Sequence, residues 1–231
     1  MIAASPIDAL NPPVHTDLHE FVRYRKKKEM SKTELLIATR NSGKTREFRE
    51  LLQKAPVILR SLDDFPEIGD VEESGTTFEE NASLKAEEYA KRSGILTAAD
   101  DSGLEVAALG GLPGVRSARF GGASANYDAK MSKLLDSINA VGGGDRRARF
   151  VSVIALARPS GEVIHLSRGE CEGVIAFEPR GGNGFGYDPI FIPNGLTRTF
   201  GELPDSEKSQ ISHRAKATAT FIRYLLDFIG L

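Results

Sequence analysis

A polar turn between an apolar run and a helical pattern is the first place where this chain could do chemistry. The run Leu35–Ala38 is typical of a buried strand, and a helical pattern begins just past position 43. Thr39, Asn41 and Lys44 therefore fall at a strand-to-helix turn. Such a turn directs free backbone N–H groups and the positive end of a helix dipole at one spot, where phosphate binds well. Because Lys44 adds a movable positive charge, the turn predicts a phosphorylated ligand.

The turn lacks the two commonest nucleotide-loop motifs. A Walker A loop needs Gly-x-x-x-x-Gly-Lys-Ser/Thr, and Gly43-Lys44-Thr45 supplies its tail, but position 38 is alanine. The glycine-rich stretch 181–186 does not complete the dinucleotide-binding fingerprint, because Tyr187 and Pro189 stand where the third glycine would fall.

Two adjacent carboxylates, Asp100 and Asp101, follow the apolar run Leu96–Ala99 and precede Ser102. We expect the strand to end there, so that at least one carboxylate faces the crevice at the strand end. Carboxylate oxygens suit Mg²⁺, which prefers one or two carboxylates together with phosphate oxygens and water. The alternative is an ordinary turn, since Asp, Ser and Gly are all turn formers.

Two further acidic residues are weaker candidates. Glu72 opens a Glu-Glu-Ser-Gly stretch before a predicted helix, and it could supply a second metal ligand or be an ordinary solvated loop residue. Glu47 lies three residues after Lys44 on one predicted helix, so the two side chains can meet. Glu47 either orients Lys44 or forms an exposed helix pair, and both interpretations stay open.

A second glycine-rich segment places aromatic rings beside an acid. Glycines on both sides of Phe185 let the backbone approach a flat ligand closely. Phe185 or Tyr187 could stack on a base, and Asp188 could accept hydrogen bonds from base or ribose. The alternative is a turn that carries core aromatic residues.

Three cationic or titratable side chains, Lys208, His213 and Arg214, gather near the start of the last predicted helix, where Ser212 is the expected N-cap. Lys208 and Arg214 could hold phosphate or a base carbonyl. Taken singly, each could equally be a solvated side chain at a helix start.

The pattern of the remaining chain predicts an α/β fold with a mixed sheet, because strands alternate with helices early and a hairpin follows. Ligands in such sheets lie beyond the carboxyl ends of strands, where Thr39 and Asp101 are both expected. The predicted helices cover Ser42–Lys54, the stretch from the Thr77 capping box to Gly94, Ala125–Asn139 and Ser212–Ile229; the predicted strands include Leu35–Ala38, Val57–Leu59, Leu96–Ala99, Phe150–Ala157 and Val163–Arg168.

Composition excludes several classes of protein. The formal net charge of −2 over 231 residues gives no bulk electrostatic drive towards nucleic acid or an anionic membrane, and no apolar run approaches the length of a membrane span. Cys171 is the single cysteine, so no internal disulfide can form, which suits a cytoplasmic location. With four histidines and one cysteine, a zinc site of Cys/His type is not expected.

Residues 1–31 differ from the rest, since prolines break any regular element and Arg23–Lys28 is a basic run. We expect a mobile N-terminal extension there and one compact domain over 32–231. The basic run could instead tether the protein to RNA, or translation could begin at Met30.

Six motifs stand in register along the chain, and together they resemble the inosine/xanthosine triphosphate pyrophosphatase family over about residues 33–230. The motifs are Thr39-x-Asn41-x-x-Lys44-x-x-Glu47, Thr77-Phe78-x-Glu80-Asn81-Ala82, Ala99-Asp100-Asp101-Ser102-Gly103-Leu104, Gly110-Gly111-x-Pro113-Gly114-x-x-Ser117-Ala118-Arg119, Phe185-Gly186-Tyr187-Asp188-Pro189 and Ser212-His213-Arg214-x-x-Ala217.

The resemblance implies an elongated mixed sheet flanked by helices, with two lobes and a central cleft, in a homodimer. It implies Mg²⁺-dependent hydrolysis of deaminated purine nucleoside triphosphates (ITP, dITP, XTP) to the monophosphate and pyrophosphate. It makes Asp101 the general base and assigns Glu72 and Asp101 as metal ligands. The implied substrate contacts are Thr39, Arg40, Asn41, Ser42, Gly43, Lys44, Ser102, Phe185, Gly186, Tyr187, Asp188, Lys208, His213 and Arg214.

In the expected reaction, water attacks the α-phosphorus and Lys44 and Lys208 hold the leaving pyrophosphate. Base choice would depend on donors, such as Arg214 and backbone N–H groups near Phe185, that meet a 6-carbonyl but clash with the amino group of adenine. A nucleotide sensor without turnover and a phosphotransferase are the competing hypotheses. The acidic pair argues against the first, and the alanine at position 38 argues against the second.

Overall fold

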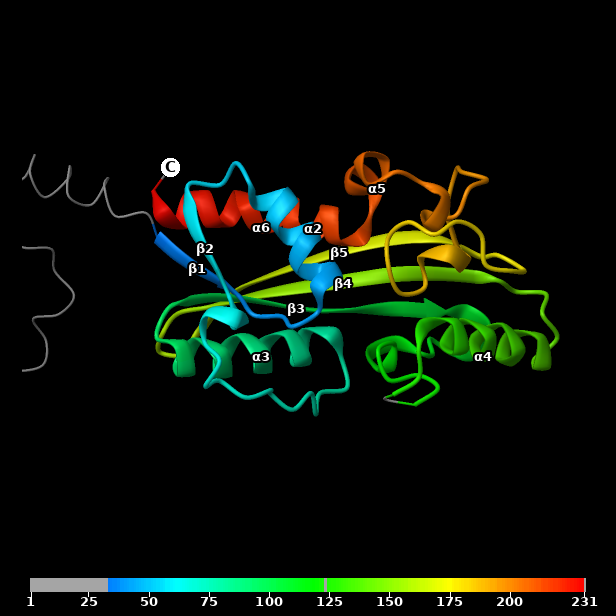
Figure 1. Ribbon diagram of the computed structural model, residues 1–231, viewed down its shortest axis with the longest axis horizontal. Helices are drawn as coiled ribbons and strands as arrows, with labels where there is room; N and C mark the ends of the chain where they lie inside the picture. The colour runs from blue at the N-terminus through cyan, green and yellow to red at the C-terminus, as the bar shows by residue number, and fades with distance from the viewer. Residues whose placement is uncertain (1–32, 123, 231) are drawn as a thin grey trace, which may run out of the picture. The chain divides into compact units, whose positions relative to one another are not determined.

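A computed structural model describes residues 33–122 and 124–230 of the protein (Figure 1). The expectations for the N-terminal extension, including its basic run and the alternative start at Met30, lie outside these residues. No helix in the described part of the chain has both the length and the apolar composition that crossing a membrane requires.

A six-stranded mixed sheet forms the centre of the described residues, which confirms the predicted fold class. Its strand order is β2-β1-β3-β4-β5-β6, with β1 parallel to β3 and the pairs β3–β4, β4–β5 and β5–β6 antiparallel. The strands are β1 (Thr33–Ile37), β2 (Val57–Ser61), β3 (Leu96–Val106), β4 (Arg147–Ala157), β5 (Val163–Ile175) and β6 (Phe191–Pro193).

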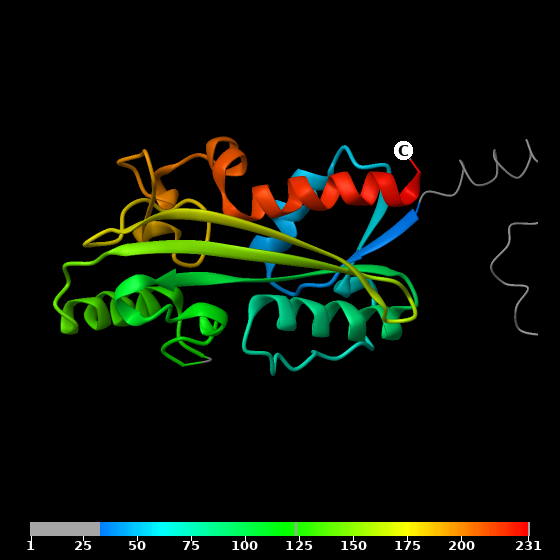
Figure 2. The ribbon, with the colours of Figure 1, turned by 180° about the vertical axis from the view of Figure 1, so that it is seen from behind.

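Helices cover both faces of this sheet. In both views α3 and α4 lie on one side, whereas α2, α5 and α6 lie on the other (Figures 1 and 2). The helices are α2 (Ser42–Leu52), α3 (Phe78–Ser93), α4 (Tyr127–Ala140), α5 (Asp205–Ile211) and α6 (His213–Ile229).

The helix boundaries follow the capping signals in the sequence. Thr77 and Glu80 form a reciprocal capping box at the start of α3, and Gly94 ends that helix with a φ of 70°, in the left-handed region that glycine adopts without strain. The Asn41 side chain caps α2 and the Ser212 side chain caps α6. Each accepts a hydrogen bond from a backbone N–H in the first turn of its helix. These caps fix where the site-bearing turns begin.

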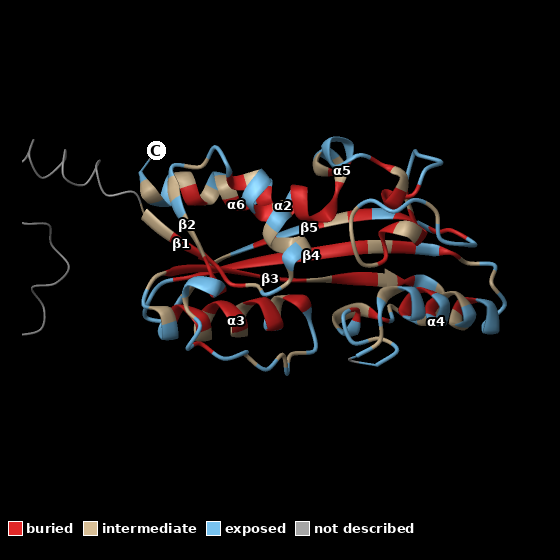
Figure 3. Cartoon of the chain, in the orientation of Figure 1, coloured by how far each residue is buried: buried red, intermediate tan, exposed pale blue. Residues whose placement is uncertain are grey.

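Buried residues form clusters on both sides of the sheet (Figure 3). One cluster packs α3 against β3 and β4, a second packs α2 and α6 against the opposite face, and a third fills the end of the sheet beside α4. Because the sheet is covered at the level of residues 96–102, polar side chains there are held in defined positions by packed neighbours.

The predicted end of β3 at Ala99 is wrong. The strand continues to Val106, because Asp101 pairs with Val153 and Leu104 with Phe150 in the long antiparallel ladder with β4. β1, in contrast, pairs with β3 only as far as Ala98. Asp100 and Asp101 therefore lie within a strand, beyond its last neighbour on the β1 side, and not in a turn.

Other differences concern the second half of the chain. The hairpin strands β4 and β5 are longer than predicted, and the short helix α5 was not predicted. The final helix buries Ala217 and Phe221, whereas Ala219 is exposed. The buried face of α6 packs against β5 and β4.

Candidate active site

A cavity of about 410 Å³ opens where β1 leaves the edge of β3. Its lining includes every site residue predicted from the sequence except Ser42 and Gly43, which form the first positions of α2. Glu72, Asp101 and Lys44 thus share one cavity. Residues from the two ends of the motif series, Thr39 and Arg214, also meet there.

The turn after β1 is organised by its own side chains. The Thr39 hydroxyl accepts a hydrogen bond from the Asn41 backbone N–H at 3.2 Å, and the Asn41 side chain accepts one from the Lys44 N–H at 3.1 Å. Arg40 reaches away to Asp70, 2.8 Å distant. Thr39 and Asn41 therefore stabilise the turn through these hydrogen bonds, and the Lys44 side chain lines the cavity.

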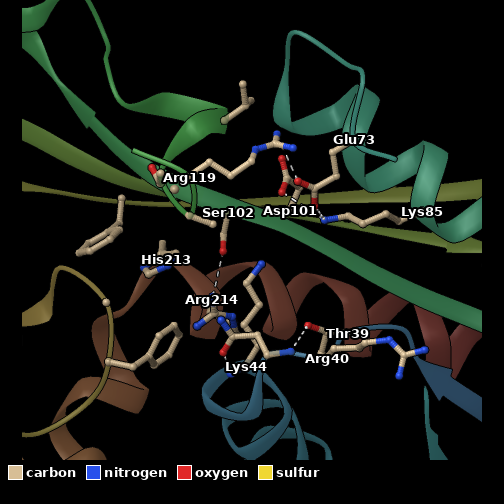
Figure 4. A pocket seen from close by; sticks show the side chains of 18 of the residues that line it. Thr39, Arg40, Lys44, Glu73, Lys85, Asp101, Ser102, Arg119, His213 and Arg214 are labelled. Atoms are coloured by element: carbon tan, nitrogen blue, oxygen red, sulfur yellow. Dashed lines mark hydrogen bonds and ion pairs between the residues drawn. The ribbon is translucent and has the colours of Figure 1, made fainter. Parts of the chain in front are cut away.

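Asp101 belongs to an acidic and basic group on the α3 side of β3 (Figure 4). The Lys85 ammonium lies 2.6 Å from a Glu73 oxygen and 3.2 Å from Asp101 Oδ1, and Asn81 donates to Asp101 Oδ2 at 3.3 Å. Arg119 approaches the other Glu73 oxygen at 3.5 Å. Burial raises the pKa of the Asp101 carboxyl above its usual value, although Lys85 opposes the shift.

Of the two adjacent loop carboxylates, Glu73 is the one that joins this group. Although burial raises its pKa, Lys85 outweighs that effect and holds the pKa of Glu73 below its usual value. Glu72 lines the cavity but is exposed, and no hydrogen bond or ion pair to it is found within the described residues. Local pattern could not distinguish the two, because neighbouring loop residues carry no periodicity.

Asp100 faces the opposite side of the strand, as the alternation of β3 requires. It is 2% exposed, lies 2.5 Å from the Lys44 ammonium and accepts a hydrogen bond from Ser152 at 2.9 Å. The Arg214 Nε lies 3.8 Å from its other oxygen. Burial would raise the pKa of Asp100, but Lys44 and Arg214 outweigh it and keep the pKa well below its usual value.

Glu47 forms neither an exposed pair along its helix nor a contact with Lys44, so both interpretations left open by the sequence are wrong. Its carboxylate bridges Arg214 and Lys208, with the Lys208 ammonium at 2.7 Å. Lys208 also lies 2.7 Å from Asp188 Oδ2 and is only 4% exposed. Residues 161 positions apart in the sequence meet here, which helical periodicity cannot predict.

The glycine-rich loop holds Phe185 against α2. A Cβ atom at Gly43 would lie 2.7 Å from the Phe185 ring, so glycine permits this close approach. The Phe185 N–H donates to Asp188 Oδ2 at 2.7 Å. Both aromatic residues line the cavity, but Tyr187 is buried and donates its hydroxyl to the Ser117 carbonyl at 3.0 Å, whereas Phe185 is half-buried.

His213 and Arg214 occupy the first turn of α6 and are both buried. The His213 ring stacks on Phe150 with centroids 4.7 Å apart, and burial, aided by Arg214, lowers its pKa well below the usual value, so the ring is neutral. Arg214 donates to the Ser102 hydroxyl at 3.0 Å, which ties the helix to β3.

Sequence reasoning missed Asn81 and Lys85, although a signal was present. Both stand on the buried stripe of α3, at positions otherwise held by Phe78, Ala82 and Ala86. A lysine and an asparagine at core positions of a helix must find polar partners, because an unpaired buried polar group is costly. That observation alone would have marked them as site residues.

No three His, Cys, Asp or Glu side chains cluster closely enough to hold a metal ion by themselves anywhere in residues 33–122 and 124–230. Asp101 and Glu73 nevertheless converge on one ammonium, so their oxygens point to a common region of the cavity. Two hard oxygen ligands, with room for phosphate oxygens and water, match what Mg²⁺ requires.

Comparison with known proteins agrees with this geometry. The family model described as "Ham1 family" matches residues 35–224. The chain is 46% identical to the dITP/XTP pyrophosphatase of Exiguobacterium sp. (84% of this chain, 98% of the relative) and 45% identical to that of Oceanobacillus iheyensis (83% and 97%). A HAM1 protein structure from Coxiella burnetii matches with a TM-score of 0.79 at 41% identity, over 84% of this chain and 99% of that one. The chain belongs to the Ham1 family.

Proposed function

We propose that the protein hydrolyses deaminated purine nucleoside triphosphates, such as dITP and XTP, to the nucleoside monophosphate and pyrophosphate. The names of the relatives support the substrate class. The observation that carries the proposal is the shared cavity, in which the Asp101 carboxylate faces the same space as the Lys44, Lys85 and Arg119 cations. Such a space fits a polyanion and supplies a base beside it.

Asp101 is the group we assign to accept the proton of the attacking water. Burial raises its pKa, so it is a stronger base than an ordinary aspartate. Lys85 and Asn81 hold the carboxylate in place through contacts to its two oxygens. The base is therefore oriented before the substrate arrives.

We propose Asp101 and Glu73 as the carboxylates that would hold Mg²⁺, in place of the predicted pair Asp101 and Glu72. When bound, Mg²⁺ would neutralise charge on the phosphate oxygens of the substrate. The shared contact with Lys85 supports Glu73 as the partner of Asp101, because it brings the two carboxylates together. Glu72, exposed at the rim, is left to interact with solvent.

The cations divide between two tasks. Lys44, Lys85 and Arg119 line the cavity and are assigned to the phosphate chain. Lys208 is satisfied by Glu47 and Asp188, so we assign it to supporting the Phe185 loop and not, as the sequence predicted, to holding pyrophosphate directly. Preorganised charges of this kind stabilise the charge that develops on phosphoryl oxygens.

Base selection is assigned to the end of the cavity near Phe185. The N–H of Phe185 is taken by Asp188, so it is not a donor for the purine. Among the described residues, no acceptor engages the N–H groups of Gly186 and Tyr187. These two groups, together with Arg214, are the proposed donors to a 6-carbonyl, and adenine would leave them facing its amino group.

The test is a comparison of dITP, XTP, GTP and ATP with the purified protein and Mg²⁺, measuring pyrophosphate and monophosphate separately. We expect equimolar products from dITP and XTP, and at least a roughly hundredfold lower kcat/KM for ATP. Release of inorganic phosphate instead of pyrophosphate would refute the reaction. Equal rates for all four substrates would refute the assigned base selection.

Two further expectations from the sequence are retained as proposals. We propose a homodimer, which sedimentation equilibrium of the full chain would test. We also propose that the protein acts in the cytoplasm, consistent with a buried free thiol at Cys171 whose pKa is raised by burial.

A further inference from the structure

Asp100 is a buried carboxylate for which the proposed reaction has no direct use. It does not line the cavity, yet it touches cations from two different helices and a hydroxyl from a neighbouring strand. We propose that Asp100, braced by Ser152, is a positioning residue that fixes Lys44 and Arg214 relative to each other at the floor of the cleft. The inference rests on the proposed function and deepens it.

The contact with Lys44 restricts a side chain that would otherwise be flexible. Lys44 extends from the first turn of α2, and only 14% of its side chain is exposed. A free lysine side chain samples many rotamers, and holding its ammonium in one place restricts that freedom. The 2.5 Å ion pair with Asp100 Oδ1 selects one position for the ammonium before a phosphate chain enters.

The contact with Arg214 completes a frame around the second cation. Its guanidinium meets Ser102 on β3, Glu47 on α2 and Asp100 on β3. Lys44 and Arg214 carry like charges and repel each other, so each disfavours the charged form of the other. The Asp100 carboxylate lies between them and offsets this repulsion.

Ser152 fixes the carboxylate itself. It is fully buried on β4, directly opposite Ser102 in the ladder, and its hydroxyl donates to Asp100 Oδ2 at 2.9 Å. Oδ1 is thereby left for Lys44. A hydrogen bond to a charged acceptor is stronger than one between neutral groups, so the Ser152 hydroxyl favours one carboxylate orientation.

Stability alone does not account for such an arrangement. Replacing a buried ion pair by apolar side chains of similar volume is often neutral or stabilising. The neighbouring positions on this face of β3 include Ala98 and Leu104, both buried and apolar. Stability therefore does not explain a carboxylate at position 100. The positioning of the two cations does.

The experiment compares Asp100→Asn, Ser152→Ala and Ser152→Thr with the wild type, measuring kcat and KM for dITP and the melting temperature. We expect kcat/KM to fall about 100-fold in Asp100→Asn, the usual scale for a lost preorganised charge, and about tenfold in Ser152→Ala, with kcat carrying most of each loss. Ser152→Thr keeps the hydroxyl and should stay within about threefold of wild type.

Ser167→Ala is the matched control, because Ser167 is a buried serine on the adjacent strand β5 whose hydroxyl bonds to His165 and to neither cation. Its melting temperature should fall as in Ser152→Ala while kcat stays near wild type. Unchanged kcat and KM in Asp100→Asn, or equal kcat losses in Ser152→Ala and Ser167→Ala, would overturn the proposal.

A second readout does not depend on turnover. Calorimetry with inorganic tripolyphosphate should show weaker binding to Asp100→Asn than to the wild type by about tenfold or more. Equal binding would also count against the positioning role. If the wild type failed to release pyrophosphate from dITP, the proposed function would fail, whereas the calorimetric comparison would still judge the role of Asp100.

Discussion

Asp100 and Asp101 are consecutive residues of one strand, yet they occupy opposite electrostatic environments. Asp100 faces α2 and α6 and is 2% exposed, and despite this burial Lys44 and Arg214 hold its pKa well below the usual value. Asp101 faces α3 and the open cavity, and burial raises its pKa. The comparison shows that alternation along a strand can separate a structural carboxylate from a reactive one by a single residue.

The same division extends to the two walls of the cleft. On the α2 and α6 side, Lys44, Lys208 and Arg214 are each matched to a buried carboxylate. On the α3 side, Asp101 and Glu73 share the single ammonium of Lys85. The first wall is arranged to stay rigid, whereas the second keeps carboxylate oxygens available for a metal ion and a proton.

Removing the reactive carboxylate should give the largest effect. Asp101→Asn keeps the shape of the side chain but loses its negative charge and cannot act as a base, so we expect kcat for dITP to fall by a factor of about 10³ or more. The measurement is pyrophosphate release under saturating Mg²⁺. Asp63→Asn, an exposed aspartate just after β2, should leave kcat unchanged.

Circular dichroism of Asp101→Asn should match the wild type, because the amide fills the same space. Activity within about tenfold of wild type, in a folded variant, would remove Asp101 from the role of base and reverse the contrast between the two aspartates.

Removing a cation from the rigid wall should mainly cost stability. Lys208→Met leaves Asp188 buried without its partner, and breaking a buried ion pair in this way typically costs about 3–5 kcal/mol. Urea unfolding would measure the loss. Lys91→Met is the control, since Lys91 forms exposed pairs along α3 and should change unfolding little. A loss no greater than that of the control would contradict the structural role of Lys208.

Much of the frame around the site was predictable because it is local. The strand-to-helix turn at Thr39, the capping box at Thr77 and the N-cap at Ser212 depend on residues within four positions, and the structure has all three. The place of Lys44 in the site was predicted from its position in that turn. Residues from five of the six motifs do meet in one cavity.

The contacts that divide the two walls were not predictable from local pattern. The ladder of β3 with β4 carries Asp100–Gly103 through a stretch whose composition favours a turn, because tertiary pairing overrides the turn preference of Asp, Ser and Gly. The partners of Glu47 and Asp100 come from helices and strands far away in sequence. Such pairs are set by how the sheet twists and how α6 packs on it.

The choice between the two loop carboxylates can be sharpened by paired substitutions. Glu73→Gln should raise the Mg²⁺ concentration needed for half-maximal activity by about tenfold or more, since even the loss of a residue that orients a metal ligand commonly costs about 10–100-fold in affinity. Glu72→Gln should change it less than about threefold, because Glu72 is exposed at the rim. The reverse order would restore the pair predicted from the sequence.

The smallest effect expected is a difference in how Asp100 and Asp101 make the free energy of unfolding depend on pH. The pKa of Asp100 in the folded protein lies below its unfolded value of about 3.8, so its contribution to stability is present above pH 3.8 and is lost as the pH falls below it. The pKa of Asp101 is raised, so ionising it costs stability as the pH rises through the window just above 3.8.

Urea unfolding of the wild type, Asp100→Asn and Asp101→Asn between about pH 2.5 and 6 would separate these contributions. The stability difference between wild type and Asp100→Asn should change below pH 3.8, and that between wild type and Asp101→Asn should change above it, with opposite sign. A tenfold difference in proton affinity between the folded and unfolded states corresponds to about 1.4 kcal/mol, which sets the scale on which urea unfolding compares the two variants. Parallel curves for the two variants would mean that the strand does not divide the aspartates electrostatically, and the distinction between a positioning wall and a reacting wall would lose its physical basis.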